Sequence, residues 1–183
     1  MEIKLTESDR ELEGILELQR QNHRSQVSET TKQTEGFVTV QHEPDTLRLM
    51  NTQARQVIAI HENEVVGYAL VMTKELRDHI PVLMPMFDMF EKIDYRGVQL
   101  SIHRYYVMGQ ICIAAAQRGM GIFQALYDKH RAVYQSRFDL CLTEVSSSNP
   151  RSMRAHEKVG FDTIHTYTDE TDEWNILAWD WKV

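Results

Sequence analysis

The sequence predicts a mixed α/β fold, with a mostly antiparallel central sheet that contains one parallel strand pair and is flanked by helices. The first observation behind this prediction is the run QVIAIH at 56–61, which turns at ENE into VVGYALVM at 65–72 and is typical of an antiparallel hairpin. The second is an apolar strand at 106–113, followed by a glycine-rich turn, a helical pattern and another strand at 140–145. This order forms a crossover, which places its two strands parallel.

Ahead of the hairpin, the chain predicts one strand and two helices. Residues 2–5 alternate as a short strand, and Asp9 is expected to cap the helix that follows. Residues 20–42 are polar and are predicted to form a mobile wall of the molecule. A short helix is then expected at 45–51, directly after Pro44.

Between the hairpin and the crossover lies a segment, 74–104, that predicts no regular central strand. Its run IPVLMPMFDMFEK carries methionines, prolines and phenylalanines, which favour an insertion that covers apolar surface. After the crossover, a helix is predicted to open at Asn149, and further strands are predicted near 161–168 and 174–181. We interpret the whole chain, 1–183, as a single domain.

Composition limits the classes of partner. The chain carries a formal charge of −7 and has a sequence pI near 5.6, so no basic cluster is available to displace counterions from nucleic acid. The longest apolar run, 65–72, is far shorter than the roughly 20 residues needed to cross a bilayer, which argues against membrane spanning. The chain begins without a basic and apolar leader pattern, and the cytoplasm is the expected location.

The cysteines and histidines predict neither a disulfide framework nor a metal site. Cys112 and Cys141 each lie inside a strand-like run and are interpreted as small core residues. His103, His130 and His165 lack the spacing of metal ligands and are expected on the surface.

The turn QRGMG, directly ahead of the crossover helix, is the strongest candidate for a binding site. The first amides of a helix have no partners within it and carry a partial positive charge, so this end favours an anion such as pyrophosphate. Gly119 and Gly121 let the backbone approach such a ligand closely, and Arg118 adds a cation with paired donors. Taken alone, the two glycines fit a tight structural turn equally well.

Two phosphate-binding interpretations compete for this turn. A dinucleotide fold would use GMGIFQ, with Gln124 at the third glycine position and Glu144 at the end of the next strand, and it would predict a nicotinamide-dependent oxidoreductase. Against it, residues 114–117 separate the strand from Arg118, and the following segments do not repeat the strand-helix-strand half.

The second interpretation starts from a later segment, NPRSMRAHEKVGF at 149–161. Together with ICIAAAQRGMGIFQALY at 111–127, it resembles the two signature segments of the GNAT superfamily of N-acetyltransferases. The positions that match the pyrophosphate loop and the asparagine helix are Arg118, Gly121, Asn149, Ser152, Gly160 and Phe161. Phe123 departs from the family, which has a small residue there, so its ring is expected either to turn away from the pyrophosphate or to narrow the site.

The resemblance implies a GNAT-like sheet that splays between the strands at 106–113 and 140–145, with acetyl-coenzyme A as co-substrate in the gap. The pantetheine arm would pair with the end of the first strand as an added strand, and Asn149 would hydrogen-bond the arm. The residues implied to bind the coenzyme are Ile111, Cys112, Ile113, Arg118, Gly119, Met120, Gly121, Ile122, Phe123, Asn149 and Ser152.

Acetyl transfer to an amine needs a base that takes a proton from the amine and an acid that gives one to the departing thiolate. In some GNAT enzymes a glutamate on the strand before the asparagine helix is the base, and Glu144 holds that position here, acting through water. His156, seven positions after Asn149, stands where some members have a tyrosine acid and others a histidine. Each residue also fits a purely structural role, Glu144 as the partner of a nearby cation and His156 as an exposed helix residue.

The resemblance therefore implies an acyltransferase that moves acetyl directly to a primary amine in a ternary complex, as a monomer or a homodimer. The segments least like the family, 20–44 and 74–104, are expected to wall the acceptor side. Candidates there for binding a cationic amine are Glu29, Glu35, Asp88, Glu91 and Asp94. A non-catalytic acyl-coenzyme A binding module stays open as an alternative, because it would keep the turn and Asn149 without depending on Glu144 or His156.

Overall fold

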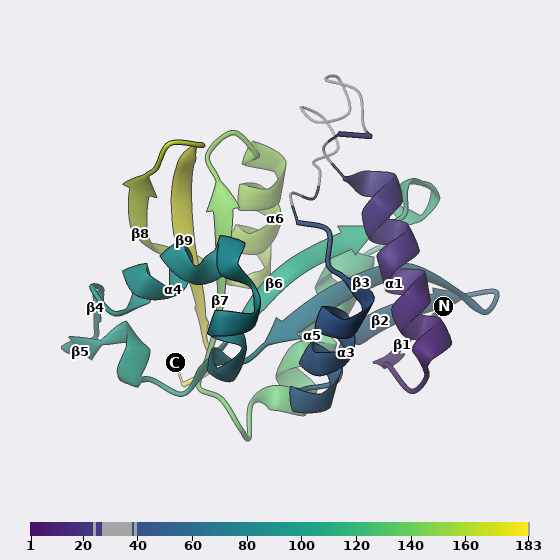
Figure 1. Ribbon diagram of the computed structural model, residues 1–183, viewed down its shortest axis with the longest axis horizontal. Helices are drawn as coiled ribbons and strands as arrows, with labels where there is room; N and C mark the ends of the chain where they lie inside the picture. Colours follow the sequence, from purple (N-terminus) through teal and green to yellow (C-terminus); the bar gives the residue numbers. More distant parts are fainter. Residues whose placement is uncertain (24, 27–37, 39, 183) are drawn as a thin grey trace.

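The computed structural model describes residues 1–23, 25–26, 38 and 40–182. Its centre is a seven-stranded sheet in the order β1-β2-β3-β6-β7-β9-β8, in which only β6 and β7 pair in parallel (Figure 1). The strands are β1 (Glu2–Leu5), β2 (Val57–His61), β3 (Glu64–Met72), β6 (Tyr105–Ile113), β7 (Leu140–Ser146), β8 (Asp162–Thr168) and β9 (Glu173–Asp180). The predicted mixed α/β class, with one parallel pair in a mostly antiparallel sheet, is confirmed.

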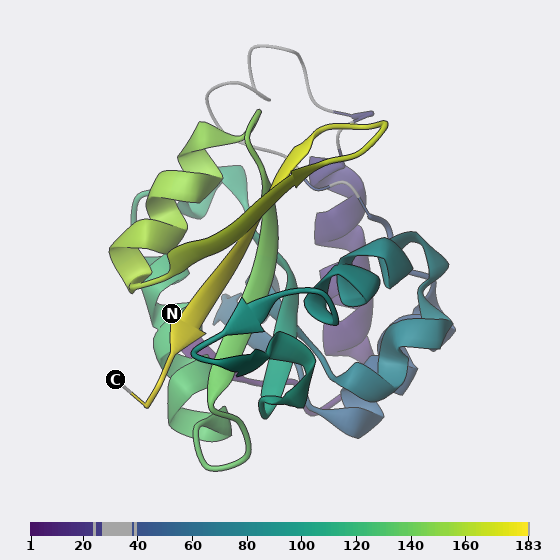
Figure 2. The same ribbon diagram turned by 90° about the vertical axis from the view of Figure 1, so that its left-hand side faces the viewer.

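Helices cover both faces of this sheet, as Figure 2 shows from its edge. On one face lie α1 (Asp9–Asn22) and α3 (Pro44–Gln53), and on the other lie α5 (Ile122–Tyr134) and α6 (Pro150–Val159). Because side chains alternate along each strand, the sheet separates two apolar cores. β6, α5 and β7 form the predicted crossover.

Local sequence signals account for the element ends. The β2–β3 hairpin turns through Glu62 and Asn63, whose φ angles of 51° and 63° are those of the tight turn that matches strand twist. The expectation that Asp9 caps α1 is wrong by one residue. Ser8 is the cap, since its hydroxyl accepts from the Glu11 amide at 3.4 Å while the Glu11 carboxylate accepts from the Ser8 amide at 3.0 Å.

The insertion at 74–104 packs on the same face of the sheet as α1, which confirms that it covers apolar surface. It consists of short elements, namely η1 (Lys74–His79), η2 (Pro81–Leu83), α4 (Met84–Phe90), β4 (Asp94–Tyr95), β5 (Val98–Gln99) and η3 (Leu100–Ile102). Phe90 is fully buried and meets the Tyr105 ring edge to face at 5.5 Å. The β4–β5 hairpin is tied to the main sheet where the Tyr95 hydroxyl donates to Asp180 at 3.1 Å.

Several expectations about single residues can be compared with the structure. Cys112 and Cys141 are both free and buried, which confirms that they are core residues. His130 was expected on the surface, and this expectation is wrong, because the residue is fully buried. Its Nδ1 lies 2.8 Å from the Tyr106 hydroxyl, and its Nε2 lies 3.1 Å from the Ala69 carbonyl. Within the described ranges, no helix is long and apolar enough to cross a membrane. Most of the expected mobile wall, with Glu29 and Glu35, lies outside the described residues.

Candidate active site

The parallel strands β6 and β7 separate soon after they meet. They pair over three positions, from Tyr105 opposite Leu140 to Val107 opposite Leu142, and then diverge (Figure 1). Just past the last pair, the Thr143 hydroxyl donates to the Met108 carbonyl at 3.0 Å and spans the widening gap. Among the described residues, no strand lies beside the last residues of β6 on the β7 side, as the resemblance implied.

The glycine-rich turn lies at the end of this gap. Gly119 and Gly121 have φ angles of 79° and 77°, in the left-handed region that favours glycine. A Cβ atom added at either glycine would meet no atom of the described residues within 4 Å, so the described structure leaves the space above the turn open. The helix α5 begins at Ile122, and its first internal bond joins the Ala125 amide to the Gly121 carbonyl, so the three preceding amides have no partner within the helix.

A cavity of about 270 Å³ joins the turn to the free edge of β6. Every residue that the resemblance implied for coenzyme binding lines it except Met120, whose side chain is 65% exposed to solvent. The remaining lining residues are Asn22, Val38, Arg151 and Ala155. Sequence reasoning missed these four, because none of them belongs to the turn or to a motif position of the asparagine helix.

Arg118 holds the turn in place through its side chain. Its Nε donates to the Ile113 carbonyl at 3.1 Å, and Nη2 donates to Asn22 Oδ1 at 2.9 Å. Asn22 in turn accepts from the Val38 amide at 3.1 Å through its backbone carbonyl. The guanidinium thus ties the end of β6, the turn and the end of α1 together.

Asn149 caps α6 at the opposite wall of the cavity. Its Oδ1 accepts from the Ser152 amide at 3.1 Å, as expected of a helix cap. Within the described part of the chain, Nδ2 of Asn149 donates no hydrogen bond. A pair of amide hydrogens therefore remains available to a ligand in the cavity.

A second, smaller cavity of about 100 Å³ continues from the first toward β7. The two cavities share Val38, Ile111, Asn149 and Ser152 in their walls. Glu144 and His156, the two candidates for proton transfer, both line the smaller cavity. The fold thus brings these two residues together next to the predicted coenzyme site.

Glu144 is partly buried on β7, and its surroundings change its acidity. Burial raises the pKa of its carboxyl to about 7, although a hydrogen bond from the Tyr167 hydroxyl to Oε1 lowers it and the charge of Asp169 raises it further. A carboxyl with this pKa is divided between its two protonation states near neutral pH. Sequence reasoning missed Tyr167, because it lies on β8 in an ordinary alternating strand.

His156 is enclosed rather than exposed, with only 1% of its surface accessible. Its Nδ1 lies 2.8 Å from the Ser152 carbonyl, which can only accept, so Nδ1 carries the proton and Nε2 is the bare nitrogen. Within the described residues, Nε2 has no hydrogen-bond partner. Burial lowers the pKa of His156 to about 4, which favours the neutral imidazole near pH 7, and the alternative of an exposed helix residue is wrong.

Phe123 turns toward an aromatic cluster. Its ring packs 5.3 Å from Tyr127 and 5.2 Å from His156, measured between ring centroids, and Phe161 packs 5.2 Å from His156. The ring therefore forms a side wall of the larger cavity and leaves the space above Gly121 open.

The structure also locates Cys112 and three acidic residues of the insertion. Burial raises the pKa of the Cys112 thiol to about 11, which disfavours the thiolate that a nucleophile would need. Asp88 and Glu91 both pair with Arg77 on the insertion. Asp94 accepts from the Gly97 amide at 2.9 Å. None of these three acids lines either cavity.

Comparison with known proteins agrees with this geometry. A family model for the acetyltransferase (GNAT) family matches residues 13–161. A search of curated proteins gave no match.

Solved structures share the fold at low identity. Ard1 from Thermoplasma volcanium matches with a TM-score of 0.65 and 13% identity, over 98% of this chain and 96% of that one. Ribosomal-protein-alanine N-acetyltransferase from Brucella melitensis has a TM-score of 0.63 and 13% identity, over 98% and 99% of the two chains. The NatC complex bound to Gag peptide and CoA gives a TM-score of 0.63 and 13% identity, over 98% and 99%. With the family match spanning most of its length, the chain belongs to the GNAT acetyltransferase family and is an acyltransferase.

Proposed function

We propose that the protein transfers the acetyl group of acetyl-coenzyme A directly to a primary amine in a ternary complex. One observation carries this proposal. The gap between β6 and β7 opens onto a cavity that ends at the glycine-rich turn, and Glu144 stands in the adjoining smaller cavity. A site for the coenzyme and a site for proton transfer are thus contiguous.

The residues of the larger cavity suit the coenzyme. The backbone groups of Ile111 to Ile113 that face the gap, apart from the Ile113 carbonyl that Arg118 occupies, would pair with the pantetheine arm, and Nδ2 of Asn149 would donate to it. The unpaired amides that open α5, with the partial positive charge of the helix end, would hold the pyrophosphate. Arg118 would keep the turn in this shape while adding its charge.

Glu144 is the proposed base. The amine nitrogen attacks the thioester carbonyl carbon, a C–N bond forms, and the C–S bond breaks to release the coenzyme thiolate. The proton lost by the amine goes to Glu144, directly or through a water in the small cavity. A pKa of about 7 suits this task, because the carboxylate is present at neutral pH and still basic enough to take the proton.

His156 is the proposed source of the proton for the thiolate. Its lowered pKa keeps it neutral near pH 7, and Nε2, which has no partner among the described residues, is an acceptor. Negative charge that develops on a sulfur nearby would raise its pKa, so the imidazolium would form only as the thiolate leaves. Because both residues line one cavity, the proton that Glu144 takes from the amine can pass to His156.

The acceptor is proposed only as a primary amine. Two structural neighbours are described as a ribosomal-protein-alanine N-acetyltransferase and as a complex with a peptide, which makes a peptide amino group one acceptor to test. A nicotinamide oxidoreductase fits poorly, since only one pair of neighbouring strands in the sheet of the described residues is parallel. A purely binding module would not require the partly buried Glu144 and the enclosed His156 to line the small cavity.

The test is release of coenzyme A thiol in the presence of an amine panel. The panel contains peptides with a free α-amino group, peptides whose only amine is on a lysine side chain, and polyamines. We expect one class to give turnover that Glu144→Gln lowers by about 10²-fold or more while acetyl-coenzyme A still binds. Binding without turnover on any class would favour the non-catalytic module.

A further inference from the structure

We infer that Tyr167 is a positioning residue for Glu144: its hydroxyl, reaching across β9, holds one carboxylate oxygen in place and leaves the other for the amine. This inference rests on the proposed function for the role of Glu144. The contact itself, however, exists independently of any turnover.

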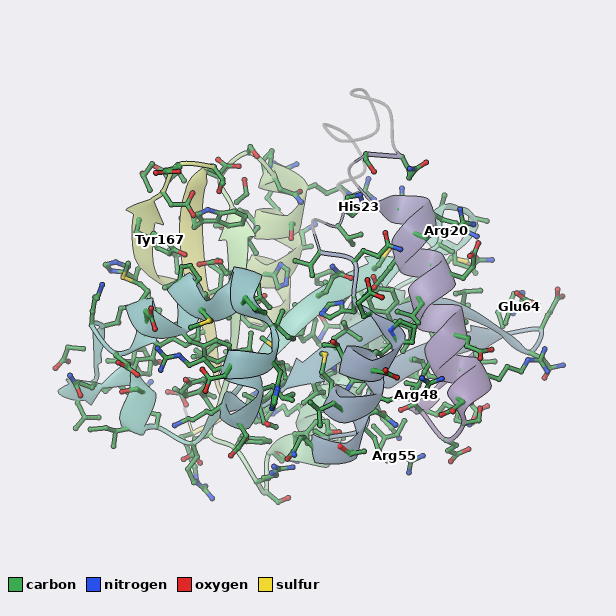
Figure 3. The ribbon with its side chains drawn as sticks, in the orientation of Figure 1. Arg20, His23, Arg48, Arg55, Glu64 and Tyr167 are labelled. Atoms are coloured by element: carbon green, nitrogen blue, oxygen red, sulfur yellow. The ribbon has the colours of Figure 1, made fainter. Side chains whose placement is uncertain are left out.

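The contact joins two strands that are not neighbours. Glu144 on β7 lies opposite Ile176 on β9, and Tyr167 on β8 lies opposite Trp174 on β9, so β9 runs between the two residues. Figure 3 labels Tyr167 on β8, the strand at the edge of the sheet. The Tyr167 side chain packs against the same core as Ile176, and its hydroxyl donates to Oε1 of Glu144.

The hydrogen bond gives the two carboxylate oxygens of Glu144 different environments. Oε1 accepts from Tyr167, whereas Oε2 accepts no hydrogen bond from the described residues. Glu144 lines the smaller cavity, so its unoccupied oxygen is the one available to an amine or a bridging water. A carboxylate fixed at one oxygen cannot rotate freely, which reduces the cost of aligning the other with a substrate proton.

Tyr167 acts as a donor and not as the acid of the reaction. Burial, followed by the neighbouring carboxylate of Glu144, raises the pKa of its phenol well above the ordinary value. The hydroxyl therefore keeps its proton throughout the physiological range and donates whenever Glu144 is charged. Because the bond favours the charged form, it opposes the burial that raises the pKa of Glu144.

Few other titratable groups face Glu144. From the end of β8, Asp169 repels its charge, and from α6, the neutral His156 lines the same cavity. Asp172, in the turn before β9, accepts hydrogen bonds from the hydroxyls of Ser146 and Ser148. On the side of α1 and the insertion, no charged side chain among the described residues lines the small cavity. Tyr167 is thus the one described group that stabilises the Glu144 carboxylate by a hydrogen bond.

The test replaces Tyr167 by Phe, which keeps the ring and removes the hydroxyl. The matched control is Tyr95→Phe, because Tyr95 also donates to a carboxylate, that of Asp180, but lies outside both cavities. The first readout is the pKa of Glu144, followed by ¹³C NMR of labelled glutamate side chains and assigned with Glu144→Gln. We expect Tyr167→Phe to raise this pKa by about one unit and Tyr95→Phe to leave it unchanged.

The second readout is kcat against pH with the best acceptor. In Tyr167→Phe we expect the rise of kcat on the acidic side of the pH profile to move up by about one pH unit, so that kcat at pH 7 falls roughly fivefold and recovers at higher pH, with the KM for acetyl-coenzyme A unchanged. Tyr167→Leu removes the hydroxyl with a different side chain and decides the matter if the first variant folds poorly. An unchanged Glu144 pKa in these variants would overturn the inference. Since the NMR titration needs no turnover, a shift without activity would retain the contact and count against the proposed function instead.

Discussion

Arg118 and Asn22 are 96 positions apart in the sequence, yet their side chains meet at 2.9 Å where the guanidinium donates to the amide oxygen. This bond joins the turn that opens α5 to the last residue of α1. Through this bond Arg118 fixes the position of the turn, in addition to placing a positive charge near it. The two roles separate in experiment, because Asn22 carries no charge.

The hydrogen bond between Arg118 and Asn22 predicts that Asn22→Ala weakens acetyl-coenzyme A binding even though the charge of Arg118 is kept. Loss of one hydrogen bond to a charged group is worth about 1.5 kcal/mol or somewhat more, or roughly tenfold in affinity. Arg118→Gln should cost more, since it removes the charge as well. Calorimetric titration measures both, with Arg154→Gln, an exposed arginine of α6 outside the cavities, as the control. Wild-type affinity in Asn22→Ala would leave Arg118 as a charge alone.

The open space above Gly121 predicts a second effect on the coenzyme. Gly121→Ala places a methyl group where the pyrophosphate would approach the backbone, and it strains a φ of 77°. Gly97→Ala is the matched control, because Gly97 has a φ of 83°, is equally open and lies in the β4–β5 hairpin. Both variants should lose about 1 kcal/mol of stability, measured by urea unfolding. Only Gly121→Ala should bind acetyl-coenzyme A more weakly, and equal binding in the two would remove the turn from the coenzyme site.

The raised pKa of Glu144 predicts the pH dependence of the reaction. A base must be deprotonated to act, so kcat should rise with pH and level off above the apparent pKa of about 7. Glu144→Gln should lower kcat and abolish the rise of kcat with pH, since glutamine does not titrate. The profile is measured with acceptor and coenzyme both saturating. A rise that persists unchanged in the glutamine variant would assign it to another group.

Buried histidines predict that acid destabilises the protein. Burial lowers the pKa of His42, His130 and His156 to about 4, from about 6.5 in the unfolded chain. The unfolded state therefore binds protons first as the pH falls, and stability drops between about pH 6.5 and 4 by roughly 1.4 kcal/mol per pH unit for each histidine. Glu144, whose pKa is raised from 4.5 to about 7, opposes one of these contributions over most of this range, down to about pH 4.5.

His156→Gln isolates one of these histidines. Urea unfolding at several pH values should show a slope smaller by about one proton than in the wild type, whatever the change in stability at pH 7. The exposed His79 is replaced by Gln in parallel as the control for the substitution itself. An undiminished slope in His156→Gln would mean that this imidazole is not held neutral in the fold.

Much of the fold follows from periodicity and turn chemistry in the sequence. The hairpin of β2 and β3 and the crossover through α5 depend on contacts near in sequence, so their apolar patterns and glycines suffice to predict them. The candidate roles of the turn, Asn149 and Glu144 came instead from the resemblance of 111–127 and 149–161 to the GNAT signature segments, and the structure places all three along the walls of the two adjoining cavities. The one-residue error at Ser8 arose because the acidic Asp9 also suits the first turn of a helix.

What the sequence did not predict depends on packing between distant elements. His156 is polar and sits on a helix with mostly polar residues, and its burial results from rings that α5 and the start of β8 bring to it. Tyr167 reaches Glu144 only because β9 inserts between β7 and β8 and sets the register of both. The Asn22 contact likewise needs α1 to end beside the turn. No spacing rule along the chain encodes these meetings.

The central claim is that the cavity between β6, the turn and α6 holds acetyl-coenzyme A. Its most direct test is thermal stabilisation of the purified protein by acetyl-coenzyme A, coenzyme A and NAD, each at about 100-fold excess over its dissociation constant, with Arg118→Glu beside the wild type. A ligand that binds only the folded state should then add about 2.7 kcal/mol of stability. The account predicts a clear rise in melting temperature with both coenzyme A species, lost in Arg118→Glu. Stabilisation by NAD alone, or by none of the three, would contradict it.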